Sequence, residues 1–229
     1  METPTLTTMV VLYTTGVRLD TNILVEQLPI NEVIIKIEKQ GVLRRGESKK
    51  DRIKRRVKTT PTKKPTGFGH NSITMVLMSV GDGRRIEKEI TVKIFQNGVF
   101  HITGVLHESY DRHVVQYIHD TIQATCPHAI VSGTWNLDSR RVVLMNYKTK
   151  LIGISNLSRE TLYLNVRKQG FKANYDPDVY PAVKIHFPDK KWIAKVFRTG
   201  QIILTGMTSE DECLELKNSL EQVVVSVSQ

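Results

Sequence analysis

The sequence predicts an α+β fold built from two copies of one half-domain, because one stretch of it occurs twice. Residues 89–106 (EITVKIFQNGVFHITGVL) and 191–208 (KWIAKVFRTGQIILTGMT) align at a fixed shift of 102, which superimposes Phe95 on Phe197. Each copy is followed by an acidic start and an amphipathic helical stretch. A repeat of this length is not a solenoid unit. We therefore expect two half-domains, 1–127 and 128–229, related by a pseudo-twofold axis and sharing a functional surface.

The first half shows the sequence signs of five strands and two helices. Strands are predicted where β-branched residues gather between turn signals, at 6–14, 33–37, 73–80, 90–95 and 99–103. A short helix at 20–28 begins with Asp20 and ends before Pro29, and a longer helix at 108–125 carries an apolar stripe at helical spacing. The stretch 41–69 combines Gly, Pro, Thr and many cations with little apolar pattern, so we expect a disordered or loosely held insertion.

The second half repeats this order after a link at 128–138. A long strand is predicted at 142–154, which Asn146 could break, followed by a helix at 158–168 with Ser158 as its N-cap. A loop is expected at 174–178. Three strands and a final helix that starts at Ser209 complete the half, the strands at 183–187, 192–197 and 201–205.

Alternation along the repeated strands separates a core face from an open face, because successive side chains of a strand point to opposite sides. The core face is almost wholly apolar and consists of Val92, Ile94, Phe100 and Ile102, with Ala194, Val196, Ile202 and Leu204 in the second copy. The opposite face carries aromatics, hydroxyls and cations, namely Lys93, Phe95, His101 and Thr103, with Lys195, Phe197, Ile203 and Thr205 in the second copy. We expect this second face to be open and functional.

The net charge of +10 is concentrated in one segment. Between Arg44 and Lys64 lie eleven Lys or Arg against Glu47 and Asp51, which gives this tract +9 and the rest of the chain about +1. Three interpretations of the tract stay open: a solvated loop, a nuclear-localisation-like signal, or an arm that binds phosphates. The candidate residues of such an arm are Lys49, Lys50, Arg52, Lys54, Arg55, Arg56 and Lys58.

Other compositional features point to an intracellular, non-enzymatic protein. Two cysteines, Cys126 and Cys213, make no disulfide framework and are expected to be buried small residues. No apolar run approaches the ~20 residues that span a bilayer, and the N-terminus lacks the basic start of a secretory signal. The sequence contains no Gly-rich phosphate loop, Cys-x-x-Cys pair or G-x-S-x-G motif, so we expect neither an enzyme nor a cofactor.

The two hairpins share a pattern of aliphatic-Phe-x-x-Gly followed by a strand that ends in Thr-Gly. It stands as Ile94-Phe95-Gln96-Asn97-Gly98 with Thr103-Gly104, and as Val196-Phe197-Arg198-Thr199-Gly200 with Thr205-Gly206. Together with residues 174–181 (NYDPDVYP), which look like a Tyr-Glu-Pro-Glu-Leu-Phe-Pro segment, this resembles the TATA-binding protein (TBP) family. The resemblance spans nearly the whole chain apart from 41–69. The divergence and the basic insertion look most like the TBP-like proteins of large DNA viruses that replicate in the cytoplasm.

The resemblance implies a saddle whose curved antiparallel sheet lies on the DNA minor groove, with helices on the convex face. In this family, aromatic wedges pushed between base steps kink the duplex. Phe95 and Phe197 match one wedge of each repeat, Tyr180 matches the second wedge of repeat two, and either Phe68 or His70 matches that of repeat one. Thr103 and Thr205 match hydroxyls at the groove floor, with Ile203 and Val10 as neighbouring contacts.

The chain departs from the family pattern at several of these positions. Lys93 and Lys195 replace apolar residues, and two ammonium groups are costly against base edges but can reach phosphates. His101 also replaces an apolar contact. Where the family has an Asn in the first strand of each repeat, this chain has Thr8 and, in the second repeat, Lys150 or Leu151. These changes weaken the expectation of a TATA-like sequence preference but not of the fold.

Two functional hypotheses follow from the resemblance. The first is a monomeric transcription initiation factor that binds double-stranded DNA in the minor groove and recruits RNA polymerase machinery. Asp176 and Asp178 match acidic residues that dock a transcription factor IIB-like protein. The second is a protein-interaction module that keeps the saddle, has lost specific TATA binding, and docks a factor IIB-like or polymerase partner. Either protein would act in the nucleus or in the cytoplasmic viral factory of an infected cell, without a membrane.

Overall fold

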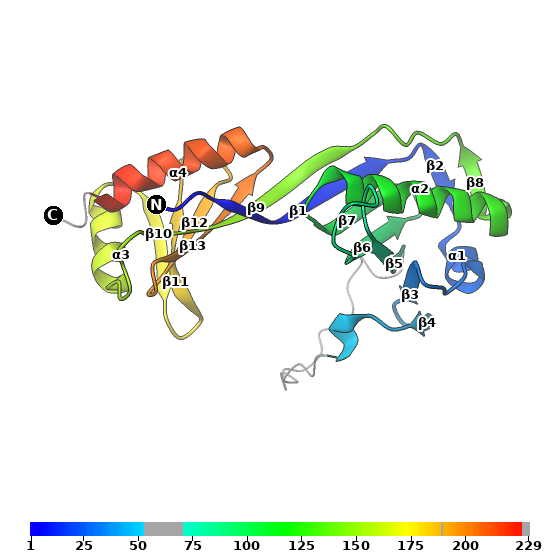
Figure 1. Ribbon diagram of the computed structural model, residues 1–229, viewed down its shortest axis with the longest axis horizontal. Coiled ribbons are helices and arrows are strands. Elements are labelled where there is room, and N and C mark those ends of the chain that lie inside the picture. Colours follow the sequence, from blue (N-terminus) through cyan, green and yellow to red (C-terminus); the bar gives the residue numbers. More distant parts are fainter. Residues whose placement is uncertain (53–70, 189, 226–229) are drawn as a thin grey trace. The chain divides into compact units, whose positions relative to one another are not determined.

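The computed structural model describes residues 1–52, 71–188 and 190–225, and these divide into two compact units (Figure 1). The N-terminal unit is Val10–Arg141, and the C-terminal unit combines Met1–Met9 with Val142–Gln229. The strand β1 (Thr5–Thr14) begins in the C-terminal unit and ends in the N-terminal unit. Each unit has an α+β fold with helices packed on a sheet, as the sequence predicted.

The N-terminal unit orders its main strands β1-β7-β6-β5-β3-β4, with β2 and β8 as a separate antiparallel pair. Its strands after β1 are β2 (Val17–Leu19), β3 (Ile34–Lys39), β4 (Leu43–Gly46), β5 (Ser72–Ser79), β6 (Lys88–Phe95), β7 (Val99–Val105) and β8 (Ile130–Gly133). Its helices are α1 (Thr21–Gln27) and α2 (Glu108–Thr125), with the 3-10 turns η1 (Lys49–Arg52) and η2 (Pro127–Ala129). Helix α2 packs on β5, β6 and β7, and α1 packs on β3, β4 and β5.

The C-terminal unit orders its strands β10-β11-β12-β13-β9-β1. The strands are β9 (Arg141–Lys150), β10 (Lys172–Asp176), β11 (Tyr180–His186), β12 (Ile193–Phe197) and β13 (Gln201–Met207). Helix α3 (Arg159–Lys168) packs on β10 and β11, and α4 (Glu210–Val225) packs on β13 and α3. The paired strands β10 to β13 and β9 are antiparallel throughout.

The core of each unit lies between the helices and one face of its sheet. All eight residues that alternation assigned to the core face are fully buried, which confirms that prediction. Each such aliphatic or aromatic side chain contributes about 1.5–3 kcal/mol by leaving water. The helices add the stripes expected from their sequences, including Val114, Ile118 and Ile122 in α2 and Leu216 and Leu220 in α4.

Side-chain caps explain where two of the helices begin. Asp20 precedes α1 and accepts hydrogen bonds from the backbone N–H of Asn22 at 2.8 Å and of Ile23 at 3.3 Å. Ser158 precedes α3 and accepts one from Thr161 at 3.3 Å. Such caps satisfy N–H groups that have no partner inside the helix. The predicted starts at Asp20 and Ser158 are therefore correct.

Four predicted segments differ from the structure. The insertion 41–69 is ordered in its first part, because β4 pairs with β3 and η1 follows it; residues 53–69 lie outside the described part. Residues 174–176 of the expected loop belong to β10, which pairs with β11. Strand β9 runs unbroken through Asn146 and ends at Lys150. The expected link contains β8, which pairs with β2.

A buried ion pair joins α2 to β1 and to the segment before β9. The Asp111 carboxylate is fully buried and accepts from Tyr13 Oη at 2.7 Å and from Arg140 Nε at 2.7 Å and Nη2 at 3.2 Å. Burial, followed by the hydrogen bond to Asp111, raises the pKa of Tyr13 well above its ordinary value. Burial opposes the charge of Arg140, but the bond to Asp111 outweighs it and raises the pKa of Arg140, so the guanidinium stays charged.

Candidate functional site

The open face of the N-terminal unit brings together the residues that alternation placed there. Lys93 of β6 lies opposite His101 of β7 on one side and Thr74 of β5 on the other. Thr91 lies opposite Thr103, and Phe95 lies opposite Ser72 at the end of the strand. Lys93 is exposed, whereas Phe95, His101 and Thr103 are half-buried. Directly paired residues share one face of a sheet, so these side chains form one surface.

The C-terminal unit repeats this surface with more cations. Lys195 of β12 lies opposite Ile203 of β13 and Lys184 of β11, while Ile203 lies opposite Lys148 of β9. Thr205 lies opposite Ile193 and Asn146. The side chains of Phe197, Lys195, Ile203 and Thr205 are all half-buried. The two phenylalanines therefore occupy matching positions on the open face of their own unit.

Strand β1 contributes Thr8 to the C-terminal unit and Val10 to the N-terminal unit. Both are half-buried and alternate with Met9 and Val11, which are 7% and 0% exposed. This alternation places Thr8 and Val10 on the side of β1 away from its buried residues.

Phe197 contacts the aromatic residue that the family resemblance paired with it. The rings of Phe197 and Tyr180 meet edge to face, with centroids 6.0 Å apart and planes at 61°. Lys184 Nζ lies 4.8 Å from the Tyr180 ring centroid, within range of a cation–π contact. Phe68 and His70, the two alternatives for the partner of Phe95, lie outside the described residues.

A hollow lies beside each phenylalanine, and the two hollows differ in charge. The one beside Phe95 encloses about 570 Å³ and is lined by Arg18 among mostly neutral groups such as Asn71 and Asn97. The one beside Phe197 encloses about 600 Å³ and is lined by three cations, Lys148, Arg159 and Arg198. The environment of Phe197 is therefore the more attractive to anions.

Asn146 is a polar residue of the open face that our sequence analysis treated only as a break in a strand. Its side-chain Oδ1 accepts a hydrogen bond from the Thr205 hydroxyl. With its oxygen and the Thr205 proton so used, the Asn146 amide keeps two N–H donors. The sequence feature that could have identified Asn146 is its place in the middle of a predicted strand, where Asn is disfavoured unless its side chain has a role.

Two histidines on the open faces are held in the neutral form. Burial and then the charge of Lys93 lower the pKa of His101 below its ordinary value. Burial, followed by Lys172 and Lys184, likewise lowers the pKa of His186. Within the part of the chain that the structure describes, His186 Nε2 is buried and makes no hydrogen bond.

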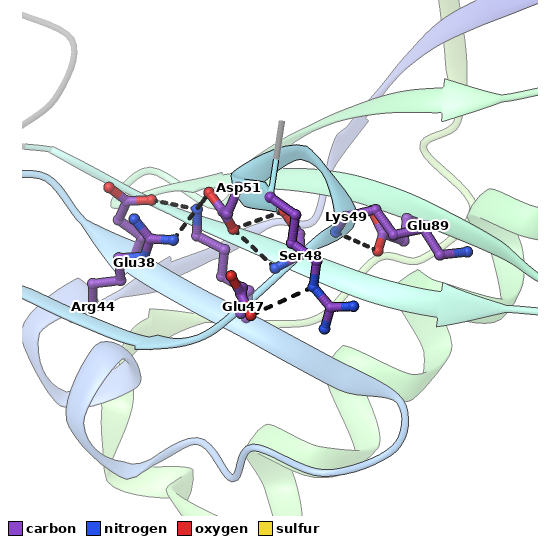
Figure 2. A network of polar contacts seen from close by, with 9 residues as sticks. Glu38, Arg44, Glu47, Ser48, Lys49, Asp51 and Glu89 are labelled. Atoms are coloured by element: carbon purple, nitrogen blue, oxygen red, sulfur yellow. Dashed lines mark hydrogen bonds and ion pairs between the residues drawn. The ribbon is translucent and has the colours of Figure 1, made fainter. Parts of the chain in front are cut away.

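The described part of the basic tract is anchored on the open face of the N-terminal unit (Figure 2). Asp51 of η1 accepts from Lys36 Nζ at 3.0 Å, from Ser48 N–H at 2.8 Å and from Arg44 Nη2 at 3.0 Å. Lys36 also pairs with Glu38 at 2.8 Å. The hydrogen bond from the Ser48 N–H holds the pKa of Asp51 far below its usual range, and the hydrogen bond from Lys36 lowers it further, against the effect of burial.

This anchored segment, residues 43–52, covers the outer strip of the open face. By register Lys36 lies opposite Val76 and Glu38 opposite Thr74, so both belong to that face. The Lys49 N–H donates a hydrogen bond to Glu89 Oε1 of β6 at 2.9 Å. Strand β6 is separated from β3 by β5. Lys49, Lys50 and Arg52 are exposed there, while Lys54, Arg55, Arg56 and Lys58 lie outside the described residues.

Asp176 and Asp178 are exposed at the turn between β10 and β11. The Asp176 carboxylate accepts from the N–H of Asp178 at 3.1 Å, which fixes the turn and leaves the Asp178 carboxylate pointing to solvent. Val179 beside them is 78% exposed. The turn thus combines two exposed carboxylates with an exposed apolar tip.

Neither cysteine is accessible: both are buried and free. Burial raises the pKa of the Cys213 thiol to about 11. Among the described residues, no group of three or more His, Cys, Asp and Glu side chains could hold a metal ion. In the same part of the chain, no helix is long and apolar enough to cross a membrane.

Comparisons with known proteins agree with these features. Residues 160–224 match the family model "Transcription factor TFIID (or TATA-binding protein, TBP)". TATA-box-binding protein 2 of Methanosarcina acetivorans is 27% identical over 108 residues, which cover 38% of this chain and 58% of that relative. The chain thus matches little more than half the length of this curated relative.

The whole chain also resembles a solved structure. Methanococcus jannaschii TBP superimposes with a TM-score of 0.61 over 99% of both chains, at 14% identity. This likeness shows that the fold is TBP-like. The family model and the curated relative thus match parts of the chain, and the likeness over the whole chain is one of fold.

Proposed function

We propose that this chain, whose fold is that of TATA-binding proteins, is a DNA-binding transcription initiation factor and not an enzyme. It contacts the minor groove with its open sheet faces and recruits the transcription machinery. One observation carries the proposal. In each unit a phenylalanine, Phe95 or Phe197, stands half-exposed on the face opposite a fully buried core, beside hydroxyls and cations. A purely structural aromatic would lie under the helices.

The polar groups of these faces suit the minor groove. A·T pairs present only acceptors there. Thr103 offers a hydroxyl, and Asn146 offers amide N–H donors because its oxygen is bound to Thr205. The two units thus bring hydrogen-bond donors of different kinds to the groove floor.

The aromatic residues supply the wedges in this proposal. Insertion of an apolar side chain unstacks a base step, which costs a few kcal/mol and bends the duplex toward the major groove. Phe197 and Tyr180, whose rings contact each other, are the proposed wedge residues of the C-terminal unit. Phe95 takes the corresponding place in the N-terminal unit.

The partner and the cellular setting follow the same family pattern. The exposed carboxylates of Asp176 and Asp178 are the proposed docking point for a factor IIB-like protein. By the resemblance of its basic insertion, we assign the chain to a divergent, viral type of TBP that acts in the nucleus or in a viral factory. Such a factor binds one duplex as a monomer.

A second function is favoured by Lys93 and Lys195, which stand on the open faces where an apolar surface suits the groove floor. If their ammonium groups prevent close approach to base edges, the protein is an interaction module. It then docks a factor IIB-like or polymerase partner without bending DNA.

A titration of labelled duplexes by fluorescence anisotropy distinguishes the two functions. A·T-rich and G·C-rich duplexes are compared with the wild type, with Phe95→Ala/Phe197→Ala, and with the control Ile86→Ala/Leu164→Ala. The control residues are exposed apolar side chains, 87% and 56% accessible, that lie off the open faces. Loss of affinity in the phenylalanine variant alone supports the initiation factor. Equal affinity of all three proteins for both duplexes favours the interaction module.

A further inference from the structure

We propose that the C-terminal unit grips the phosphates of duplex DNA through a row of three lysines, Lys148, Lys184 and Lys195, that crosses its open face. The inference rests on the proposed DNA-binding function and adds a division of labour to it. The C-terminal face holds DNA of any sequence, and the N-terminal face is left to discriminate between base pairs.

The strand register places the three lysines in one line. Lys184 of β11 lies opposite Lys195 of β12, Lys195 opposite Ile203 of β13, and Ile203 opposite Lys148 of β9. Directly opposed residues of antiparallel strands share a face. Because neighbouring strands lie ~4.8 Å apart, the row spans about 14 Å. This is more than twice the ~6 Å width of the minor groove, so its ends can reach phosphates on both strands.

The row carries positive charge without compensating carboxylates. Within the described ranges, none of the three lysines forms an ion pair. The ammonium of Lys184 instead lies over the ring of Tyr180. Like charges directly opposite each other across two strands destabilise a sheet, so the pair Lys184 and Lys195 is unfavourable in the free protein. An anionic ligand would relieve that repulsion.

Other charged groups of the same face reinforce the positive field. Lys172 lies opposite His186 on this face, and burial, followed by the charges of Lys172 and Lys184, lowers the pKa of His186. At the β9 end, Lys148 opens into the hollow beside Phe197, where Arg159 and Arg198 also lie. Two carboxylates lie near the ends of the row. Asp176 sits at the far end of β10 opposite Tyr180, and Glu2 lines a second hollow with Lys148 and Lys150.

At the corresponding place, the described residues of the N-terminal unit form no comparable row of lysines. There the register reads His101, Lys93, Thr74, Glu38 and Arg44 from β7 to β4. The histidine is neutral because burial and Lys93 lower its pKa, and Glu38 is paired with Lys36. Arg44 at the outer end of the row is paired with Asp51. The inner part of the row, at β5 to β7, therefore offers a hydroxyl and one lysine rather than a line of charge, a composition suited to contacts with base edges.

Lysine is suited to the proposed role because its ammonium is a flexible point charge that binds phosphate without fixed geometry. Phosphate contacts carry no sequence information themselves. Each one releases a counterion, so that log K falls with log salt by about 0.9 per contact on B-form DNA. The row of three lysines should account for about 2.7 of the salt slope.

The test compares two triple variants of equal charge change by salt-dependent anisotropy titration. Lys148→Gln/Lys184→Gln/Lys195→Gln removes the row. Arg167→Gln/Lys168→Gln/Lys217→Gln removes three cations from α3 and α4, on the helix side. We expect the salt slope of the row variant to fall by about 2–3 units. Its affinity for A·T-rich and for G·C-rich duplexes should fall by the same factor, so that the ratio of the two affinities is unchanged. The helix variant should keep the wild-type slope, and Lys→Arg at the row should restore it.

The outcomes separate this inference from the proposed function. If the wild type binds duplexes but both triple variants lose the same slope, the row is not a phosphate grip and DNA binding stands. If the row variant loses its A·T preference at an unchanged slope, the lysines read bases and the inference is also wrong. No duplex binding by the wild type would refute the proposed function and this inference together. Removal of like charges should leave the melting temperature equal or higher, so loss of folding is not expected.

Discussion

Tyr180 and Phe197 present their rings to each other on neighbouring strands, with centroids 6.0 Å apart. The strand register explains this pair. Phe197 lies opposite Ala182, which is 1% exposed. Because the Ala182 side chain is small, the ring of Tyr180, two residues earlier on the same strand, can contact Phe197. The pair therefore depends on a small residue between two large ones on one face of the sheet.

We expect Phe197→Ala to reduce duplex affinity about 5- to 150-fold, since loss of aromatic stacking on a base costs about 1–3 kcal/mol. Tyr180→Ala should reduce it as well. The double variant should lose less than the sum, because residues in contact are coupled. Tyr163→Ala is the matched control: Tyr163 pairs with Tyr175 at 6.3 Å on the helix side. Anisotropy titration would contradict the expectation if the control lost as much affinity as Phe197→Ala.

The buried Asp111 makes a sharp prediction for stability. Asp111→Asn should cost about 3–5 kcal/mol, because it leaves the charge of Arg140 without its buried partner. Tyr13→Phe should cost about 1–3 kcal/mol, because it removes one hydrogen bond to a charged group while Arg140 still satisfies the carboxylate. Urea unfolding at neutral pH measures both, and equal losses in the two variants would argue against an ion pair as the anchor.

The anchor of the basic segment should be lost in acid. The folded protein holds the pKa of Asp51 below the ordinary value of ~3.9. The stabilisation is therefore present above about pH 4 and disappears as the pH falls below it. Asp51→Asn should lower the melting temperature at pH 7, with a difference from the wild type that shrinks toward pH 3. Glu47→Gln is the control, since Glu47 pairs with Arg52 only at 3.5 Å on the surface.

The ionisation of His101 reports on the open face of the N-terminal unit. Its pKa is depressed first by burial and then by Lys93. Lys93→Gln removes that positive charge and should move the His101 pKa up toward ~6.5, whereas Lys93→Arg should leave it in place. An NMR titration of the imidazole measures the shift. An unchanged pKa in Lys93→Gln would mean that Lys93 does not face His101 in solution.

The faces of the sheets could be predicted from sequence because they depend on local alternation. In a strand such as β6, buried and accessible side chains alternate. Val92 and Ile94 are buried, whereas Lys93 and Phe95 between and after them are accessible. The hairpin at Gly98 was equally clear. Its φ of 75° favours glycine, and a Cβ there would lie 2.0 Å from the Val17 carbonyl oxygen.

Segments whose structure depends on distant partners could not be predicted in this way. Residues 174–176 are typical of turns, and they form β10 only because β11 pairs with them. Strand β4 has no apolar pattern and is held by β3 and the charges around Asp51. Asn146 was read as a break, because its partner Thr205 lies 59 residues away in the chain. In each case a long-range contact outweighs local propensity.

The central claim is that Phe95 and Phe197 enter the duplex from the open faces. Energy transfer between dyes at the two ends of a short A·T-rich duplex measures bending directly. We predict that the wild type shortens the end-to-end distance and that Phe95→Ala/Phe197→Ala leaves the duplex straight at saturating protein. Full bending by the double variant, or a straight duplex with saturating wild type, would contradict the account.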